Sequence, residues 1–550
     1  MGDEFLIQNE DNFKKVSELR TLSTNADDFN LTRNIRDEKL FDRVFLKDEF
    51  YELISNQNTY FIVGEKGSGK TAYAVYYCNN KRIGIAELNR VPPQMYYKFI
   101  GLKQRGLLEN TPYHEIWENV IMMMILSYIK NDLEKNIFKQ FFNRKKIEQI
   151  SSFLDKFHKN AYDPNFQAIL DVVQSYTEKI SSELSTKLTI PKTGVGSKIN
   201  GESGEQNTST SHLQKTSMAL TELSNESKQL FKNLNYPKTI DFFIDGIDIL
   251  PEDVDYEIYK ACIEGLANAV VNLNSDKLLR SMGVRICLLI RPDLLFDMKL
   301  YNGGQIIKNN TVYLKWEVAD KDYRQSLLFK MADNYLSKQQ EKPSKRLGKT
   351  WDHYFPYSYK PFRNSDELNS FVEFLSYSNY KPRDILTLLN LVIEKNKHSN
   401  TKDHFSRKDL KRVQEQYHNY LKSELRDYMS VYISIDEFKI FDSFLKSLNK
   451  LGIYKKFTYS EFVEAYNNSK ISLEQGSNKL SSPDLLLQLM FDAKLICYFD
   501  TLAPQQGDIK HWSLKEKDYS SMMPKIELNV AYQFHNEYAN AYDIKFKKEK

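Results

Sequence analysis

The stretch Tyr60–Tyr77, YFIVGEKGSGKTAYAVYY, most constrains the fold of this 550-residue chain. A short apolar run, typical of a buried strand, ends at Gly64, and a pattern typical of a helix follows Lys70. Between them, residues 64–71 fit the pattern G-x-x-x-x-G-K-[ST] of the phosphate-binding P-loop. A strand, this loop and a helix in that order predict an α/β domain built on a parallel sheet.

Each residue type in the loop suits the binding of a polyphosphate. Glycines leave the backbone N–H groups free to face phosphate oxygens, and the following helix adds the positive end of its dipole. We expect Lys70 to reach the β- and γ-phosphates and the Thr71 hydroxyl to ligate Mg²⁺. The predicted cofactors are ATP and Mg²⁺, and the predicted binding residues are Gly64, Glu65, Lys66, Gly67, Ser68, Gly69, Lys70 and Thr71. No guanine-reading N-K-x-D follows the later strands, which favours ATP over GTP.

A P-loop needs a carboxylate at the end of a neighbouring strand to hold Mg²⁺. Residues 239–244, TIDFFI, predict such a strand, and Asp245 follows at its carboxyl end, where ligands bind in open α/β sheets. Asp245 is therefore the predicted second metal residue. Asp241, inside the strand, is expected to be a structural or edge residue. Asp248 either orients the attacking water or caps the next turn.

Apolar runs elsewhere predict the rest of the sheet and the domain organisation. Residues 82–88, 284–290 and 311–316 predict further strands, and helical patterns lie between them, which indicates a parallel sheet with helices on both faces. The predicted parts are an amino-terminal arm (1–40), a P-loop core (41–320) with an exposed insertion at about 186–217, a helical lid (321–430) and a winged-helix-like domain (431–550).

The last of these parts carries a well-marked helix. Ser482 is placed to cap it and Pro483 to occupy its first position, and two short strands, 495–499 and 510–514, follow. A helix that reads DNA normally exposes Arg, Lys, Asn or Gln, whereas this one presents two aspartates and a glutamine. The pattern favours a module that contacts protein. The alternative is a DNA-binding ATPase that grips a duplex with this domain.

Composition narrows the class of protein further. The chain has 77 Lys and Arg against 73 Asp and Glu, an excess too small for a protein that coats nucleic acid. The scattered cysteines argue against disulfides and zinc sites, and fit a reducing cytoplasm. The longest apolar run, 120–126, is too short to cross a bilayer, and the acidic start lacks the pattern of a signal peptide. We expect a cytoplasmic protein with no membrane association.

Three short segments add a resemblance to a known family. They are IDGID at 244–248, IRPDLL at 290–295 and YKPRDIL at 380–386. With the P-loop, they resemble AAA+/STAND-related bacterial P-loop ATPases, and more narrowly a group of stand-alone ATPases often found in defence gene clusters. The resemblance covers about residues 40 to 400.

The resemblance implies roles for residues outside the P-loop. By position, Arg291 would sense the γ-phosphate, and Pro382 and Arg383 would touch the nucleotide from the lid. The alternative for Arg291 is a surface arginine before a proline turn. The alternative for Arg383 is an arginine at a helix start that pairs with Asp384 or another acid.

One departure from the family concerns hydrolysis. Typical AAA+ ATPases follow the Mg²⁺ aspartate with a glutamate that polarises water, but this chain has Gly246. Either Asp248 or Glu252 takes that role, or hydrolysis is slow and the protein is a nucleotide-held switch. The resemblance thus implies a regulatory ATPase that acts through a homo-oligomer or a separate effector protein, in anti-phage defence. Its expected catalytic residues are Lys70, Asp245, Asp248 and Arg291.

Overall fold

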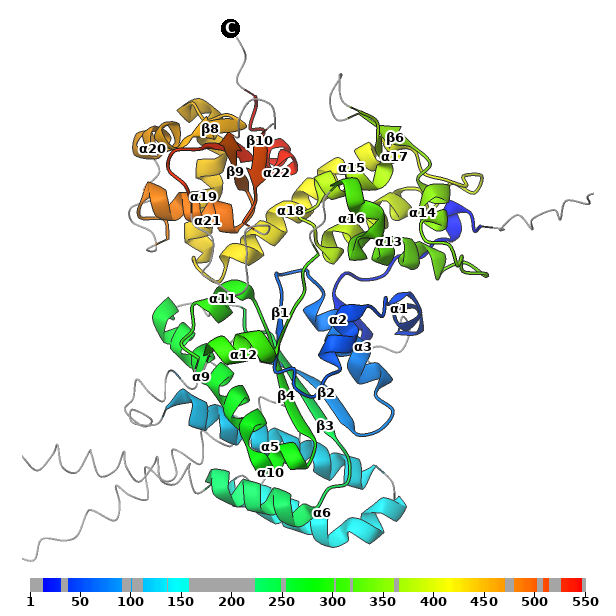
Figure 1. The fold of residues 1–550 in the computed structure, drawn as a ribbon, viewed down its shortest axis with the longest axis vertical. Coiled ribbons are helices and arrows are strands. Elements are labelled where there is room, and N and C mark those ends of the chain that lie inside the picture. The colour runs from blue at the N-terminus through cyan, green and yellow to red at the C-terminus, as the bar shows by residue number, and fades with distance from the viewer. Residues whose placement is uncertain are drawn as a thin grey trace, which may run out of the picture. The chain divides into compact units, whose positions relative to one another are not determined.

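The computed structural model describes most of the chain (Figure 1). The described residues are 13–30, 38–91, 100, 112–135, 137–157, 223–248, 254–300, 303–316, 320–360, 366–469, 479–501, 508–513 and 526–546. The insertion predicted at 186–217 lies outside these ranges. The chain divides into two compact units: Leu53–Gly64 with Tyr77–Tyr313, here called the sheet unit, and Met1–Glu52 with Glu65–Tyr76 and Leu314–Lys550, called the loop unit.

The sheet unit is α/β, as predicted, with a five-stranded parallel sheet in the order β2-β3-β4-β1-β5. Every residue of β1, β3 and β4 is buried, because strands covered by helices on their faces must be apolar along their length. The strands are β1 (Phe61–Val63), β2 (Ile85–Arg90), β3 (Ile240–Asp245), β4 (Val284–Ile290) and β5 (Thr311–Tyr313). Internal strands β1, β4 and β3 are neighbours, so their carboxyl ends lie at one edge of the sheet.

Two strand predictions were wrong at their ends. Strand β2 begins at Ile85 rather than at residue 82, because Gly84 has a left-handed φ of +104° just before it. A Cβ atom at Gly84 would lie 2.5 Å from the Thr239 carbonyl oxygen, so this turn requires glycine. Strand β5 ends at Tyr313, three residues earlier than predicted.

Helices flank this sheet (Figure 1). The apolar run 120–126 lies in α5 (Tyr113–Glu134), a buried helix, as expected. Helix α5 packs on α9 (Tyr256–Ser275), where the Trp117 indole donates to the Cys262 carbonyl at 3.0 Å. The other flanking helices are α6 (Ile137–Phe157), α10 (Lys277–Ser281), α11 (Pro292–Phe296) and α12 (Gly303–Asn309).

The first part of the loop unit is helical around an aromatic core. The Trp351 ring lies 4.9 Å from Phe371 and 5.1 Å from Phe374, centroid to centroid. The helices are α1 (Glu38–Val44), α13 (Leu327–Ser337), α14 (Lys349–Tyr354), α15 (Ser370–Tyr377), α16 (Pro382–Lys395), α17 (Arg407–Arg412) and α18 (Gln414–Met429). The short strands β6 (Ser358–Tyr359) and β7 (Leu368–Asn369) pair beside them.

The described part of the amino-terminal arm, residues 13–30, is hydrogen-bonded to this helical part. Amide side chains bind its backbone: the Arg20 N–H donates to Gln339 at 2.8 Å, and Asn390 donates to the Leu22 carbonyl at 2.7 Å. The Lys14 N–H donates to Gln340 at 3.0 Å. Residues 13–30 therefore belong to the packed loop unit.

The last part of the loop unit holds a four-stranded antiparallel sheet in the order β10-β9-β11-β8. Strands β9 (Ile496–Thr501) and β10 (Asp508–His511) overlap the pair predicted at 495–499 and 510–514, but β10 begins two residues and ends three residues earlier than predicted. Strands β8 (Lys456–Thr458) and β11 (Ala531–Phe534) were not predicted. The accompanying helices are α19 (Ile435–Ser447), α20 (Tyr459–Asn468), α21 (Pro483–Asp492) and α22 (Asn536–Ala541).

Two further expectations bear on the class of protein. The four cysteines are free thiols, as predicted from their spacing. Within the described ranges, no helix combines the length and the apolar character that a bilayer span requires.

Candidate functional site

The P-loop connects strand β1 to helix α3 (Lys70–Asn80), as predicted. Its first residue, Gly64, donates its N–H to the Ile290 carbonyl at the end of β4, at 3.2 Å. Gly67 and Gly69 have φ values of +83° and +96°, a left-handed backbone that other residues rarely adopt. The left-handed glycines and the following helix start are the features that a concave anion-binding loop requires.

Two polar side chains in the loop are buried. The Lys70 ammonium, in a residue 8% exposed, donates to the Glu65 carbonyl at 3.3 Å. The Ser68 hydroxyl is buried and has no hydrogen-bond partner among the described residues. Leaving a buried hydroxyl unpaired costs about 1–3 kcal/mol, so the loop is suited to a ligand that supplies acceptors.

Helix α16 begins directly against this loop. The Arg383 N–H donates to the Gly67 carbonyl at 3.2 Å, and a Cβ atom at Gly67 would lie 3.2 Å from the Arg383 Cβ. Pro382 and Arg383, predicted to touch a nucleotide, are thus placed beside the glycine loop. The guanidinium of Arg383 donates to Glu424 of α18 at 3.3 Å, so the described structure has the alternative arrangement, an arginine at a helix start paired with an acid other than Asp384.

An apolar pocket of about 120 Å³ lies next to the first turn of α3 within the loop unit. Its wall combines segments that are far apart in the sequence: the arm, α1, the start of α3, Trp316, and helices α13 and α16. The lining residues include Leu22, Phe29, Phe41, Gly69, Ala72, Tyr73, Trp316, Met331, Pro382 and Leu386. Sequence reasoning missed this pocket, because no local pattern brings these segments together.

Asp245 ends β3 within the sheet unit and is 7% exposed. Its carboxylate accepts the Gly246 N–H at 2.8 Å. Gly246 has a φ of +85°, and a Cβ atom there would lie 3.2 Å from the Val91 carbonyl oxygen. A glutamate, or any other residue with a side chain, would therefore be strained at this position.

Both alternatives for Asp248 stay open, because the turn that follows it, residues 249–253, lies outside the described residues. Helix α9 further along is capped by Asp255, whose side chain accepts the Glu257 and Ile258 N–H groups at 2.9 and 3.3 Å. Asp248 itself is half-buried. Glu252, the other residue considered for polarising water, lies outside the described residues.

Arg291 follows β4, the strand between β1 and β3, and is fully buried. Its guanidinium donates to both carboxylate oxygens of Asp293, at 3.0 and 2.5 Å. The alternative of a surface arginine is therefore wrong, because the side chain folds back on the first turn of α11. Asp245 and Arg291 thus follow adjacent strands at one edge of the sheet.

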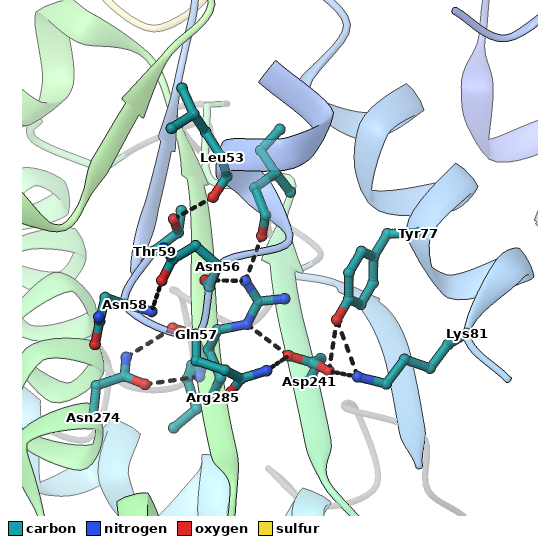
Figure 2. Close-up of polar contacts among 12 residues, drawn as sticks. Leu53, Asn56, Gln57, Asn58, Thr59, Tyr77, Lys81, Asp241, Asn274 and Arg285 are labelled. Atoms are coloured by element: carbon teal, nitrogen blue, oxygen red, sulfur yellow. Dashed lines mark hydrogen bonds and ion pairs between the residues drawn. The ribbon is translucent and has the colours of Figure 1, made fainter. Parts of the chain in front are cut away.

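Asp241 lies at the opposite, amino-terminal end of β3 and has a structural environment (Figure 2). It is fully buried and accepts from Arg285 at 2.6 Å, from Tyr77 at 3.0 Å and from the Lys81 ammonium. The Arg285 guanidinium also donates to the Asn56 carbonyl at 2.8 Å. The structural interpretation of Asp241 is confirmed, but β3 is an internal strand and not an edge.

The charges around Asp241 determine its ionisation. Burial raises the pKa of its carboxyl group, but Arg285 and Lys81 outweigh burial, so the pKa lies below its ordinary value. A pattern in the sequence could have indicated the pairing of Asp241 with Arg285. Strands β3 and β4 each have a charged residue at the second position, and these residues, Asp241 and Arg285, are cross-strand partners.

Comparison with known proteins found no protein-family model, no curated protein and no solved structure that matches this chain.

Proposed function

We propose that this protein is a Mg²⁺-dependent, ATP-binding regulatory ATPase whose nucleotide state controls its conformation or assembly, and through it a partner protein. The observation that carries the proposal is the P-loop itself. It follows an internal strand of a parallel sheet, has left-handed Gly67 and Gly69, and holds the buried, unpaired hydroxyl of Ser68. These are the features that a polyphosphate requires.

Two further residues suit Mg²⁺. Thr71 follows Lys70 at the start of α3, and Asp245 is the last residue of β3. Mg²⁺ usually binds through one or two protein oxygen ligands together with phosphate oxygens, so these two residues would hold it. The ion would neutralise charge on the β- and γ-phosphates, and Arg291, at the end of the adjacent strand β4, would respond to the γ-phosphate.

The apolar pocket beside Gly69 suits the base of ATP. A nucleotide whose phosphates lie at the start of α3 would extend its sugar and base away from that helix end. The pocket touches the same helix turn at Gly69, Ala72 and Tyr73, and its lining is mostly apolar, as an aromatic base requires. Pro382 and Leu386 of α16 close it from one side, so residues 321–430 would act as a lid over the nucleotide.

Replacing Ala72 by phenylalanine should separate base binding from phosphate binding. The larger side chain would fill part of the pocket, so we expect the affinity for ATP to fall about tenfold. The affinity for inorganic triphosphate should change less than about twofold, because the loop is intact. Isothermal titration calorimetry with both ligands measures this, and an equal loss for both would contradict the assignment of the pocket.

The expected rate of hydrolysis is low. Gly246 offers no group to polarise water, and its left-handed backbone disfavours any other residue. Asp248 is the remaining described candidate for orienting the attacking water. Slow hydrolysis suits a switch that is held by its nucleotide and released by an oligomer or a separate effector. The resemblance to defence-associated ATPases suggests anti-phage defence as its setting, with the winged-helix-like part, 431–550, as a protein-contact module.

The switch is tested by the mass of the purified full-length chain in solution. We expect light scattering to show a larger assembly with a non-hydrolysable ATP analogue and Mg²⁺ than with ADP or without nucleotide. The physical reason is that γ-phosphate contacts to the loop and to α16 would stabilise one conformation over the other. If neither mass nor small-angle scattering profile changes with nucleotide, the switch is refuted.

A further inference from the structure

The P-loop of this chain carries two charged side chains at its variable positions, Glu65 and Lys66. Both are paired with residues from the carboxyl-terminal third of the chain, within the loop unit. The Lys66 ammonium lies 2.7 Å from an Asp427 carboxylate oxygen on α18. The Glu65 carboxylate lies 3.5 Å from the Lys494 ammonium, which follows α21.

The acidic residue presents an electrostatic problem for a phosphate loop. A carboxylate within a few ångströms of a bound polyphosphate repels it, and little solvent is available to screen that repulsion. The Glu65 side chain is only 11% exposed, and that of Lys494 only 3%. The ammonium of Lys494, 3.5 Å from this carboxylate, supplies a counter-charge that would reduce its repulsion of an anionic ligand.

The position of Lys494 is determined by the fold of the carboxyl-terminal module. The residue has a left-handed φ of +64° where helix α21 ends. Its N–H donates to the Phe491 carbonyl at 3.0 Å, and the Leu495 N–H donates to the Met490 carbonyl at 3.0 Å. These bonds close the end of the helix, so the ammonium reaches Glu65 only when the module (residues 431–546) is folded and docked on the loop.

We propose that Lys494 is a positioning residue that neutralises Glu65 and thereby makes nucleotide affinity depend on the docking of the carboxyl-terminal module. This inference rests on the proposed function, because it concerns the same phosphate loop. Coupling of this kind is reciprocal: a module that strengthens nucleotide binding is itself held in place by the nucleotide. The contact thus links the phosphate loop to the part of the chain that would meet a partner.

The first test replaces Lys494 by asparagine, which tolerates a left-handed backbone better than most residues other than glycine. We expect the affinity for a non-hydrolysable ATP analogue with Mg²⁺ to fall about tenfold, as calorimetry measures it. Adding Glu65→Gln to the same chain should restore the affinity to within about twofold of the wild type, because the carboxylate that needed neutralising is gone. A merely structural role of Lys494 would not produce this rescue.

A matched control is Lys439→Asn in the same module. The Lys439 side chain is 71% exposed and pairs with Asp436 one helix turn away, so nucleotide affinity should not change. Wild-type affinity in Lys494→Asn, or failure of Glu65→Gln to rescue a folded Lys494→Asn, would overturn the inference. Lys70→Ala distinguishes failure of this inference from failure of the proposed function. If the Lys70→Ala protein retains ATP binding, the proposed function itself fails.

If Lys494→Asn does not fold, Glu65→Gln alone answers the question by hydrogen exchange. In the wild type, exchange in residues 482–499 should slow when the ATP analogue binds, because the ion pair transmits the stabilisation. In Glu65→Gln, nucleotide should still bind, because residue 65 would contribute to the P-loop through its backbone, which this change keeps, but the protection should be lost. Equal protection in both proteins, or none in the wild type, would refute the coupling.

Discussion

Replacement of Lys70 by alanine is expected to lower the affinity for ATP by about 100-fold or more. The ammonium would donate to two phosphate groups, and each such charge-assisted hydrogen bond contributes about 2 kcal/mol. The fold should survive, because the hydrogen bond from the Lys70 ammonium to the Glu65 carbonyl is long, at 3.3 Å, and alanine is well tolerated in a helix such as α3. Calorimetry with the ATP analogue and Mg²⁺ measures the affinity.

Two comparisons make this result specific. The exposed Lys439→Ala variant should bind ATP as the wild type does, because it lies in α19 and pairs only locally with Asp436. Lys70→Ala should also lose nucleotide-dependent assembly in solution. Tight ATP binding by a folded Lys70→Ala protein would refute the P-loop interpretation, and with it the proposed function.

Replacement of Asp241 by alanine is expected to destabilise the sheet unit by about 3–5 kcal/mol, because it leaves Arg285 buried without its carboxylate. Arg285 and Asp241 are both fully buried, so water cannot replace the lost partner. The guanidinium keeps the Asn56 carbonyl at 2.8 Å, which does not neutralise its charge. Urea unfolding followed by fluorescence of Trp117, a buried residue of this unit, measures the loss.

The exposed Asp436→Ala variant is the control, and its unfolding should match that of the wild type. The dependence of stability on pH provides a second measurement. The pKa of Asp241 is lowered in the folded state, so its stabilisation is complete above the unfolded pKa of about 4 and is lost as the pH falls through the folded value. As the pH falls below 4, the free energy of unfolding of Asp241→Asn should decrease less than that of the wild type. Unchanged unfolding of Asp241→Ala would contradict the structural role.

Local patterns were sufficient for the internal strands β3 and β4 and for the glycine loop, but not for β8 and β11. Apolar runs predicted β3 and β4 to within one residue, and the spacing of Gly64, Gly67, Gly69 and Lys70 predicted where helix α3 begins. The ends of β2 and β5 were predicted less well. At Gly84 the turn is set by the approach of Thr239, a contact that the local sequence does not reveal.

Where the sequence allowed more than one interpretation of a residue, only the tertiary structure could distinguish them. Arg291 precedes a proline, which is typical of both a surface turn and a buried site, and only packing shows that it is buried against Asp293. The pair of Asp241 and Arg285 depends on strand order, because β3 and β4 are separated by a helix in the sequence. The partners of Glu65 and Lys66 lie more than 300 residues away.

The amino-acid sequence by itself determined a strand, a glycine loop and a helix start with the chemistry for a polyphosphate, because backbone conformation and helix dipole act over a few residues. Only the tertiary structure decided which distant groups surround that loop: the apolar pocket, the start of α16 and the ammonium of Lys494. Such contacts depend on how whole helices pack, and packing is governed by buried area and charge pairing summed over the chain.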